Sequence, residues 1–276
     1  MAVTSASGRR SGEVRPEWKE TLGAVGVVPP VVTDLRAGLA EAGAVIVPGY
    51  ATDPERLVDA AATALGGGLR ELFGIRAQGG TDAPILGLHS DGANVVVDVH
   101  GHPVRLRDPD EDWLLMLCGR AADSGGDSVL VDGYALVEAL RTAAEPELRE
   151  VHEFLVGTDV DFFGSWVQPA RGVPATPLVR RMVEYTRAGR RAVRASDYAA
   201  PVPRSPYWDT ELALIERYAD VLATAMEVAP RFRLDAGDLF VLDNYRFLHG
   251  RDAYRGERTL HVLTVRSVGA FGARAW

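Results

Sequence analysis

Three residues carry the side chains that commonly bind a transition metal. His89 and Asp91 stand two positions apart in the stretch 86–92, and side chains at positions i and i+2 of an extended strand point to the same face. His249, far downstream in the stretch 243–251, supplies a third ligand. Two imidazoles and one carboxylate on one face of iron(II) leave other coordination positions open for small ligands and O₂. The pattern therefore predicts a metal site made of His89, Asp91 and His249.

A histidine and an aspartate at this spacing also occur by chance in exposed turns, so further residues have to support the metal site. Arg258 follows His249 and opens an apolar, β-branched run that ends at Val265. A guanidinium binds a carboxylate through two parallel hydrogen bonds. We therefore expect Arg258 to bind a carboxylate.

Several separated motifs occur together along the chain, in the order HSDG, SGGDS, DN, HGR and ERTL. In these motifs the chain resembles the TauD/TfdA-type, clavaminate-synthase-like Fe(II)/2-oxoglutarate-dependent dioxygenases, from about Gly43 to Val265. The resemblance implies a mainly β fold with flanking helices and a double-stranded β-helix (jelly-roll, cupin-like) core. It also implies iron(II), 2-oxoglutarate and O₂ as cofactor and cosubstrates.

The resemblance also assigns roles to individual residues. It implies that the two histidines and the aspartate named above hold the iron, and that Arg258 pairs with the distal carboxylate of 2-oxoglutarate. Ser128 stands where the family usually has a threonine that contacts the same cosubstrate. Arg266, on the same face of the final strand as Arg258, is the alternative arginine for 2-oxoglutarate.

One position departs from the family pattern. Several relatives carry a second arginine four residues after the first, which binds an acidic substrate, and here that residue is Val262. Sulfonate and aryloxy-acid substrates therefore fit less well than a small polar metabolite, such as an amino acid or an intermediate of specialised metabolism. The candidate substrate contacts, placed by analogy, are Asn94, Trp166, Arg171 and Tyr245.

The resemblance implies that 2-oxoglutarate is decarboxylated to succinate while an unactivated C–H bond of the substrate is hydroxylated, or the substrate is desaturated or cyclised. Related halogenases replace the carboxylate ligand with a small residue, so Asp91 argues against halogenation. The alternative is a ligand-binding or zinc-dependent hydrolytic β-barrel, because catalytic zinc also takes two histidines and a carboxylate. Such a hydrolase does not need Arg258.

Composition narrows the class of protein. The chain of 276 residues has an ordinary globular composition, and its net charge of −8 gives no reason to expect a nucleic-acid partner. The single cysteine, Cys118, lies in an apolar run, which predicts a buried thiol in a reducing, cytoplasmic compartment. No apolar stretch approaches the roughly 20 residues of a membrane span. We expect a small-molecule substrate and no membrane partner; a homo-oligomer is compatible with these features.

The chain is predicted to form a flexible tail over residues 1–16 and one domain over 17–276, with an insertion or lid region at about 157–210. Within this region the arginines outnumber the acids Glu184 and Asp197; they are Arg171, Arg180, Arg181, Arg187, Arg190, Arg191, Arg194 and Arg204. This basic segment indicates either an anionic ligand or the solvated face of a hairpin that turns at 188–190. The acidic run 108–112 is expected to be solvated.

Periodicity predicts the elements that position these residues. Helices are expected at 34–42 with Thr33 as N-cap, from a capping box at 52–55 to about 65, and at 134–143, 146–156 and 207–228. Strands are expected at 44–49, 94–99, 113–118 and 129–131, before His249 and around Arg258. Short strands around helices, with the candidate ligands on distant strands, are typical of a closed double-layer β architecture.

Overall fold

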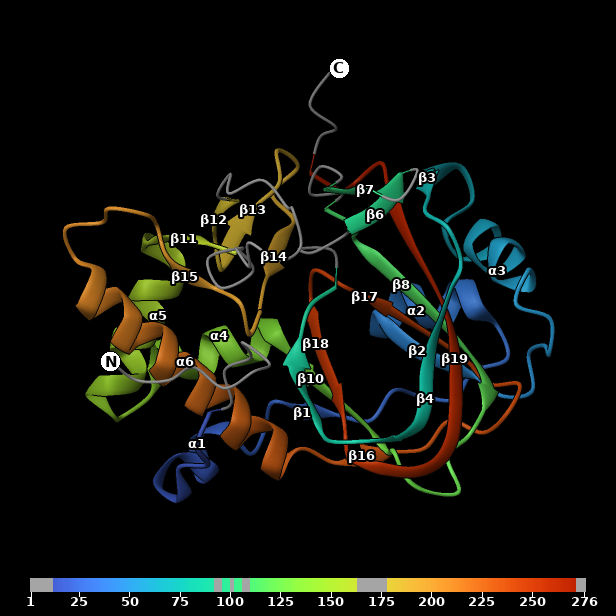
Figure 1. The fold of residues 1–276 in the computed structure, drawn as a ribbon, viewed down its shortest axis with the longest axis horizontal. Helices are drawn as coiled ribbons and strands as arrows, with labels where there is room; N and C mark the ends of the chain where they lie inside the picture. The colour runs from blue at the N-terminus through green and yellow to red at the C-terminus, as the bar shows by residue number, and fades with distance from the viewer. Residues whose placement is uncertain (1–11, 92–95, 100–101, 106–109, 163–177, 272–276) are drawn as a thin grey trace.

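Two facing β-sheets form the centre of the protein (Figure 1). The computed structural model describes residues 12–91, 96–99, 102–105, 110–162 and 178–271. The mainly β architecture with flanking helices, predicted from the sequence, is confirmed.

The larger sheet has the strand order β2-β17-β8-β19-β3, and β4 and β9 also pair with β19. These strands are β2 (Ala44–Val47), β17 (Leu239–Asp243), β8 (Trp113–Arg120), β19 (Tyr254–Ser267), β3 (Leu69–Leu72), β4 (Arg76–Ala83) and β9 (Ser124–Gly125). The smaller sheet has the order β1-β10-β18-β5, with β16 on β10. Its strands are β1 (Gly26–Val27), β10 (Ser128–Asp132), β18 (Phe247–Arg251), β5 (Leu86–His89) and β16 (Arg231–Phe232).

Side chains that alternate between the two faces of each strand form an inner core between the sheets and an outer core on the far side of the larger sheet. On β8, Leu114, Met116 and Cys118 pack between the two sheets, while Leu115 and Leu117 face outward. The inner core also receives Leu130, Phe240, Leu242, Phe247, Leu260 and Val262 from both sheets. Because successive side chains of a strand point to opposite faces, Arg258 shares the inner face of β19 with Leu260 and Val262.

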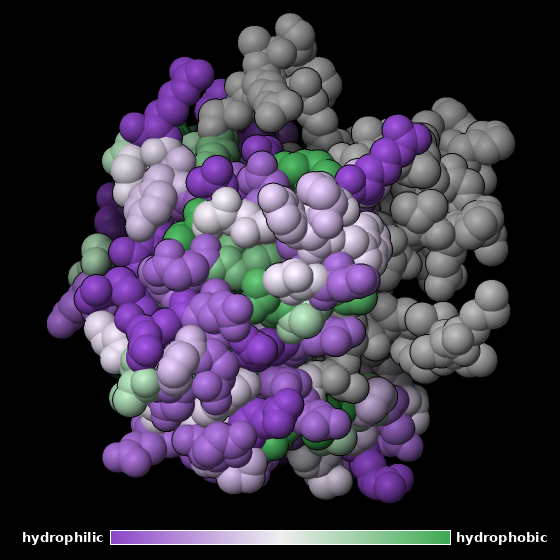
Figure 2. Space-filling view, turned by 90° about the vertical axis from the view of Figure 1, so that its left-hand side faces the viewer, coloured by the Kyte–Doolittle hydropathy of each residue, from purple (hydrophilic) through white to green (hydrophobic). Residues whose placement is uncertain are grey.

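Helices cover the two outer faces. The larger sheet packs against α2 (Leu35–Ala42) and α3 (Arg56–Leu65). The smaller sheet packs against α1 (Lys19–Leu22), α4 (Gly133–Thr142), α5 (Pro146–Gly157) and α6 (Trp208–Val228), and η1 (Pro16–Trp18) and η2 (Gly66–Gly68) are single turns. Seen from the side of α5 and α6, most of the described surface is hydrophilic, with small scattered apolar areas (Figure 2). No helix in the described ranges combines the length and apolar character needed to cross a membrane.

The predicted N-terminal caps of two helices are wrong. The N-cap of α2 is Asp34, not Thr33, because the Asp34 carboxylate accepts a hydrogen bond from the Ala37 N–H. The predicted capping box does not form: Asp53 accepts the Glu55 N–H, and α3 begins only at Arg56. In both cases the residue after the predicted threonine, an aspartate, accepts the backbone N–H group near the start of the helix.

The attached part of the chain begins earlier than predicted. Residues 1–11 of the expected tail lie outside the described residues. The Glu13 N–H donates to the Asp220 carboxylate on α6, and the Arg15 guanidinium pairs with the same carboxylate at 3.0 Å. The N-terminal segment from residue 13 is therefore held against α6.

The region 157–210 contains two small sheets in its described parts. One consists of β11 (Asp159–Asp161), β12 (Val179–Arg181) and β15 (Ala200–Pro201), and the other is the hairpin β13 (Val183–Tyr185) and β14 (Arg191–Val193). The predicted hairpin turn is confirmed, with Gly189 at a φ of 80°. Strands β6 (Val96–Val99) and β7 (His102–Arg105) form another hairpin.

The acidic run at 108–112 is not solvated, and this prediction is wrong for its described part. Asp110, Glu111 and Asp112 are 8%, 1% and 0% exposed. Three arginines of the basic segment reach these acids and their neighbours. Arg190 pairs with Asp112 and with Asp243 at 2.6 Å.

Asp110 pairs with Arg194 at 3.0 Å and with Arg180 at 3.3 Å. Arg194 also pairs with Glu184 at 2.8 Å. Neither of the two predicted roles of the basic segment applies to these arginines, because they neutralise carboxylates inside the protein. The paired acids and arginines are distant in sequence, so local composition did not reveal the match.

Arg190→Ala is expected to lower the free energy of unfolding by about 3 kcal/mol, because it leaves two carboxylates in the interior without their cation. Urea denaturation measures this change. Arg187→Ala is the matched control, since Arg187 is an exposed arginine on the same turn. An equal and small effect of both substitutions would contradict a structural role of the Arg190 pairs.

Candidate metal centre and cosubstrate pocket

The structure brings His89, Asp91 and His249 together, as the sequence predicted. The strand pairing of β18 with β5 places His249 directly opposite His89, and the two rings lie 4.3 Å apart between centroids. Asp91 Oδ1 lies 3.4 Å from His89 Nε2 and 3.9 Å from His249 Nε2. One ligand atom from each residue falls within 4.8 Å of the other two. This donor set fits a transition-metal ion bound from one side.

A backbone contact orients the first imidazole. His89 Nδ1 lies 2.9 Å from the carbonyl oxygen of Gly87, so this nitrogen donates and Nε2 is left facing Asp91. Such second hydrogen bonds fix the ring of a metal-binding histidine. His249 Nδ1 is buried and has no hydrogen-bond partner among the described residues.

The protonation of the three groups suits metal binding. Burial, with a smaller contribution from the nearby His89, lowers the pKa of His249 to about 3, so its imidazole is neutral. Burial alone would raise the pKa of Asp91, but its hydrogen bond to His89 and the nearby His249 and Arg76 outweigh burial and lower it. Burial lowers the pKa of His89, but the Asp91 contact outweighs it and raises the pKa overall. The neutral imidazole of His249 and the ionised carboxylate of Asp91 are the forms that bind a metal ion.

Asn244 holds the backbone of the candidate metal loop, which is the segment 90–91 directly after β5, and the sequence did not predict this role. It lies in the turn between β17 and β18 and is 3% exposed. Its Oδ1 accepts the Asp91 N–H at 3.1 Å, and its Nδ2 donates to the carbonyl oxygens of Asp91 at 2.9 Å and Glu111 at 2.8 Å. The only sequence signal was the Asp-Asn pair that precedes His249, which carries no information about its partners.

Asn244→Ala is expected to weaken Mn(II) binding by about tenfold to a hundredfold, because the Asp91 backbone loses both bonds that position it. Calorimetric titration of the apo-protein with Mn(II) measures the change. Urea denaturation of the same samples serves as the control that the protein is folded. Unchanged Mn(II) affinity in a folded variant would show that Asp91 does not depend on this amide.

Arg258 is a buried cation with no acidic partner in the described part of the chain. It lies on the inner face of β19, is 8% exposed, and burial lowers its pKa. Its nearest aromatic contact is the Tyr254 ring, 5.7 Å from the guanidinium carbon. Burying a charge without a counter-charge is costly. An anionic ligand would remove that cost.

Arg266, the alternative arginine for 2-oxoglutarate, already has an acidic partner. Arg266, farther along the same face, pairs with Glu71 at 3.3 Å. The predicted second contact, Ser128, is 8% exposed and shares the inner face of β10 with Leu130. The loop before Ser128 packs beside Arg258, since a Cβ on Gly126 would lie 3.6 Å from Arg258 Cδ. The geometry therefore favours Arg258 over Arg266 and brings the Ser128 loop next to it.

Of the four predicted substrate contacts, Asn94, Trp166 and Arg171 lie outside the described residues. Tyr245 is 4% exposed, and both functions of its hydroxyl are used within the protein. This hydroxyl donates to the Asp110 carbonyl at 2.7 Å and accepts the Phe271 N–H at 3.1 Å. In this structure Tyr245 acts in packing.

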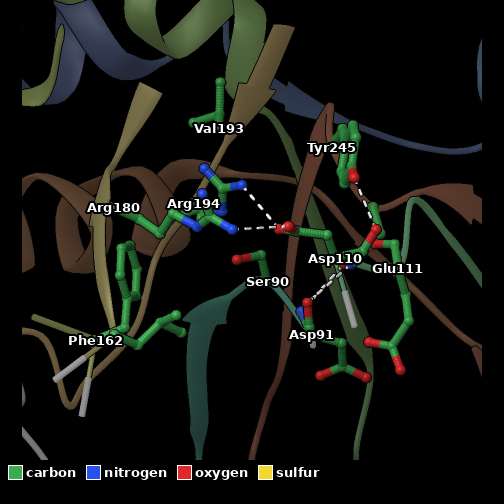
Figure 3. A pocket seen from close by; sticks show the side chains of 11 residues that line it. Ser90, Asp91, Asp110, Glu111, Phe162, Arg180, Val193, Arg194 and Tyr245 are labelled. Atoms are coloured by element: carbon green, nitrogen blue, oxygen red, sulfur yellow. Dashed lines mark hydrogen bonds and ion pairs between the residues drawn. The ribbon is translucent and has the colours of Figure 1, made fainter. Parts of the chain in front are cut away.

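A small cavity lies behind the candidate metal loop (Figure 3). Residues of the 157–210 region and of the metal loop line it together, among them Phe162, Arg180, Val193, Arg194, Ser90 and Asp91. Figure 3 shows the Asp91 and Glu111 carboxylates pointing away from Arg180 and Arg194, whose guanidinium groups meet Asp110. These two arginines therefore stand behind the metal loop.

Comparisons with known proteins identify the family and the fold of the chain. A family model described as "Taurine catabolism dioxygenase TauD, TfdA family" matches residues 27–264. The PvcB protein from Pseudomonas aeruginosa has a similar structure, with a TM-score of 0.55 at 16% identity over 98% of this chain and 96% of that chain.

Two further solved structures share the fold. AAD-2 in complex with Mn(II) and N-oxalylglycine matches with a TM-score of 0.54 at 16% identity, over 98% of this chain and 94% of that one. A taurine dioxygenase from Burkholderia xenovorans matches with a TM-score of 0.54 at 17% identity, over 94% of this chain and 86% of that one.

Proposed function

The chain belongs to the TauD/TfdA family of dioxygenases and is a non-heme iron(II)- and 2-oxoglutarate-dependent oxygenase with a jelly-roll core, and we propose that His89, Asp91 and His249 bind its iron. We propose further that Arg258 and Ser128 bind the distal carboxylate of 2-oxoglutarate. The observation that carries the proposal is the combination of the convergent His-Asp-His donors with a buried arginine that has no acidic partner among the described residues and lies on an inner strand face.

The remaining residues define what the protein contributes to the chemistry. When bound, iron(II), 2-oxoglutarate and O₂ supply the oxidising power that breaks an unactivated C–H bond, with succinate and CO₂ as coproducts. Arg258 orients the cosubstrate by pairing with its distal carboxylate. The inner-core side chains Leu260 and Val262 keep water away from this pair, which strengthens it. Asn244 holds the Asp91 loop in the position that the metal requires.

We propose a small polar metabolite, such as an amino acid, as the substrate, and hydroxylation, desaturation or cyclisation as the outcome. The carboxylate of Asp91 supports oxidation over halogenation, because it fills the coordination position that a halide would need. The region 157–210 is proposed to form an insertion that packs against the back of the Asp91 loop, since Phe162 and Val193 line the cavity behind it. A zinc hydrolase does not need a buried arginine such as Arg258, which has no acidic partner among the described residues. Arg258 therefore favours the oxygenase over this alternative.

Arg258→Ala is expected to raise the Kd for 2-oxoglutarate by about thirtyfold or more, the effect of removing one partner of a buried charge pair. Titration of Mn(II)-loaded protein with 2-oxoglutarate measures it, and Mn(II) affinity itself should stay the same. Arg266→Ala is the matched control and should change the Kd little. If Arg266→Ala has the larger effect instead, Arg266 is the cosubstrate arginine.

A further inference from the structure

A second arginine enters the interior of the barrel close to the candidate metal ligands. Arg76 begins β4, and its pairing partner on β19 is Val262, a residue of the inner core. Paired residues on neighbouring antiparallel strands have side chains on the same face, so Arg76 points inward. Its Nη2 atom lies 3.9 Å from Asp91 Oδ2.

The hydrogen-bond donors of Arg76 are not satisfied by the described residues. The 3.9 Å separation from Asp91 is too long for a hydrogen bond, and Arg76 Nε is buried without a partner. Asp91 also directs its other oxygen, Oδ1, toward both histidines. The Arg76 side chain is 36% exposed, so a small molecule can reach it.

The other arginines near the candidate site are occupied. Arg180 and Arg194 pair with Asp110, and Arg190 pairs with Asp112 and Asp243. The proposed function assigns Arg258 to the cosubstrate. Arg258 lies two positions before Leu260 on β19, and Arg76 is paired with Val262, two positions after Leu260. The two arginines therefore occupy different places along β19. Arg76 therefore lies beside Asp91, and its guanidinium N–H groups form no hydrogen bond with the described residues.

We propose that Arg76 binds a carboxylate of the substrate, so that the enzyme oxidises small carboxylic acids close to their acidic end. The planar guanidinium fork matches a carboxylate with two parallel hydrogen bonds. Val262 leaves the position four residues after Arg258 apolar, and Arg76 supplies a cation beside that position from the neighbouring strand. Because Arg76 is next to Asp91, even a short acid anchored there reaches the metal. This inference rests on the proposed function.

Two other roles for Arg76 make different predictions. If Arg76 served to hold Asp91, its removal would weaken metal binding. If it bound 2-oxoglutarate, its removal would weaken binding of the cosubstrate analogue N-oxalylglycine. If it binds the substrate, its removal should leave both affinities intact, and Mn(II) should bind at least as tightly because a positive charge beside the metal is removed.

The test compares wild type with Arg76→Gln and the matched control Arg70→Gln, an exposed arginine on β3. Mn(II) and N-oxalylglycine affinities are measured first by calorimetry. The loaded proteins are then titrated, with thermal shift as the readout, with the proteinogenic L-amino acids, simple aliphatic carboxylic acids and the corresponding carboxamides. We expect wild type and Arg70→Gln to bind at least one acid more tightly than its amide. Arg76→Gln should bind that acid at least about tenfold more weakly.

Several results would overturn the inference. One is the absence of any acid that wild type prefers over its amide, and another is an acid preference that persists in Arg76→Gln. A loss of Mn(II) or N-oxalylglycine affinity in Arg76→Gln would assign the arginine to Asp91 or to the cosubstrate. Failure of wild type itself to bind Mn(II) and N-oxalylglycine would instead reject the proposed function, and this inference with it.

Discussion

The candidate site depends on one strand pairing, that of β18 with β5. This antiparallel contact joins residues far apart in the chain and sets His249 opposite His89. A shift of one residue would turn His249 to the outer face, because side chains alternate along a strand. The register is fixed by burial: Phe247 fills the inner core while Leu248 packs under the helices on the other side. The hydrophobic pattern thus positions His249, a candidate metal ligand.

The distribution of charge separates structural from functional arginines. Arg190 and Arg194 reach buried carboxylates and have their charge neutralised by the fold. Arg258 is buried on the inner face of β19 with no acidic partner among the described residues, and Arg76 is half-buried on the same face with an Nε that none of them accepts from. An uncompensated cation in the interior lowers stability. The buried Arg258 and the half-buried Arg76 near the three candidate metal ligands are therefore suited to binding anionic ligands.

The sequence predicted what depends on local pattern. The i and i+2 spacing of His89 and Asp91, and the inner-face position of Arg258, follow from strand alternation. The prediction that His89 and Asp91 share one strand holds only for His89. Strand β5 ends at His89, and Asp91 lies in the bend after it. Asp91 therefore owes its position to Asn244 rather than to a strand. Neither the Asn244 contacts nor the burial of Asp112 could be predicted, since the partners lie far away in the sequence and meet only in the folded chain.

The most direct test of the account is an anaerobic visible spectrum of the apo-protein after addition of iron(II) and then 2-oxoglutarate. Three protein ligands on one side of the metal leave room for a cosubstrate that chelates it through two atoms. A weak metal-to-ligand charge-transfer band that requires both additions and is lost in His249→Ala is the expected result. Absence of this band from wild-type protein that demonstrably binds iron and 2-oxoglutarate would contradict the account.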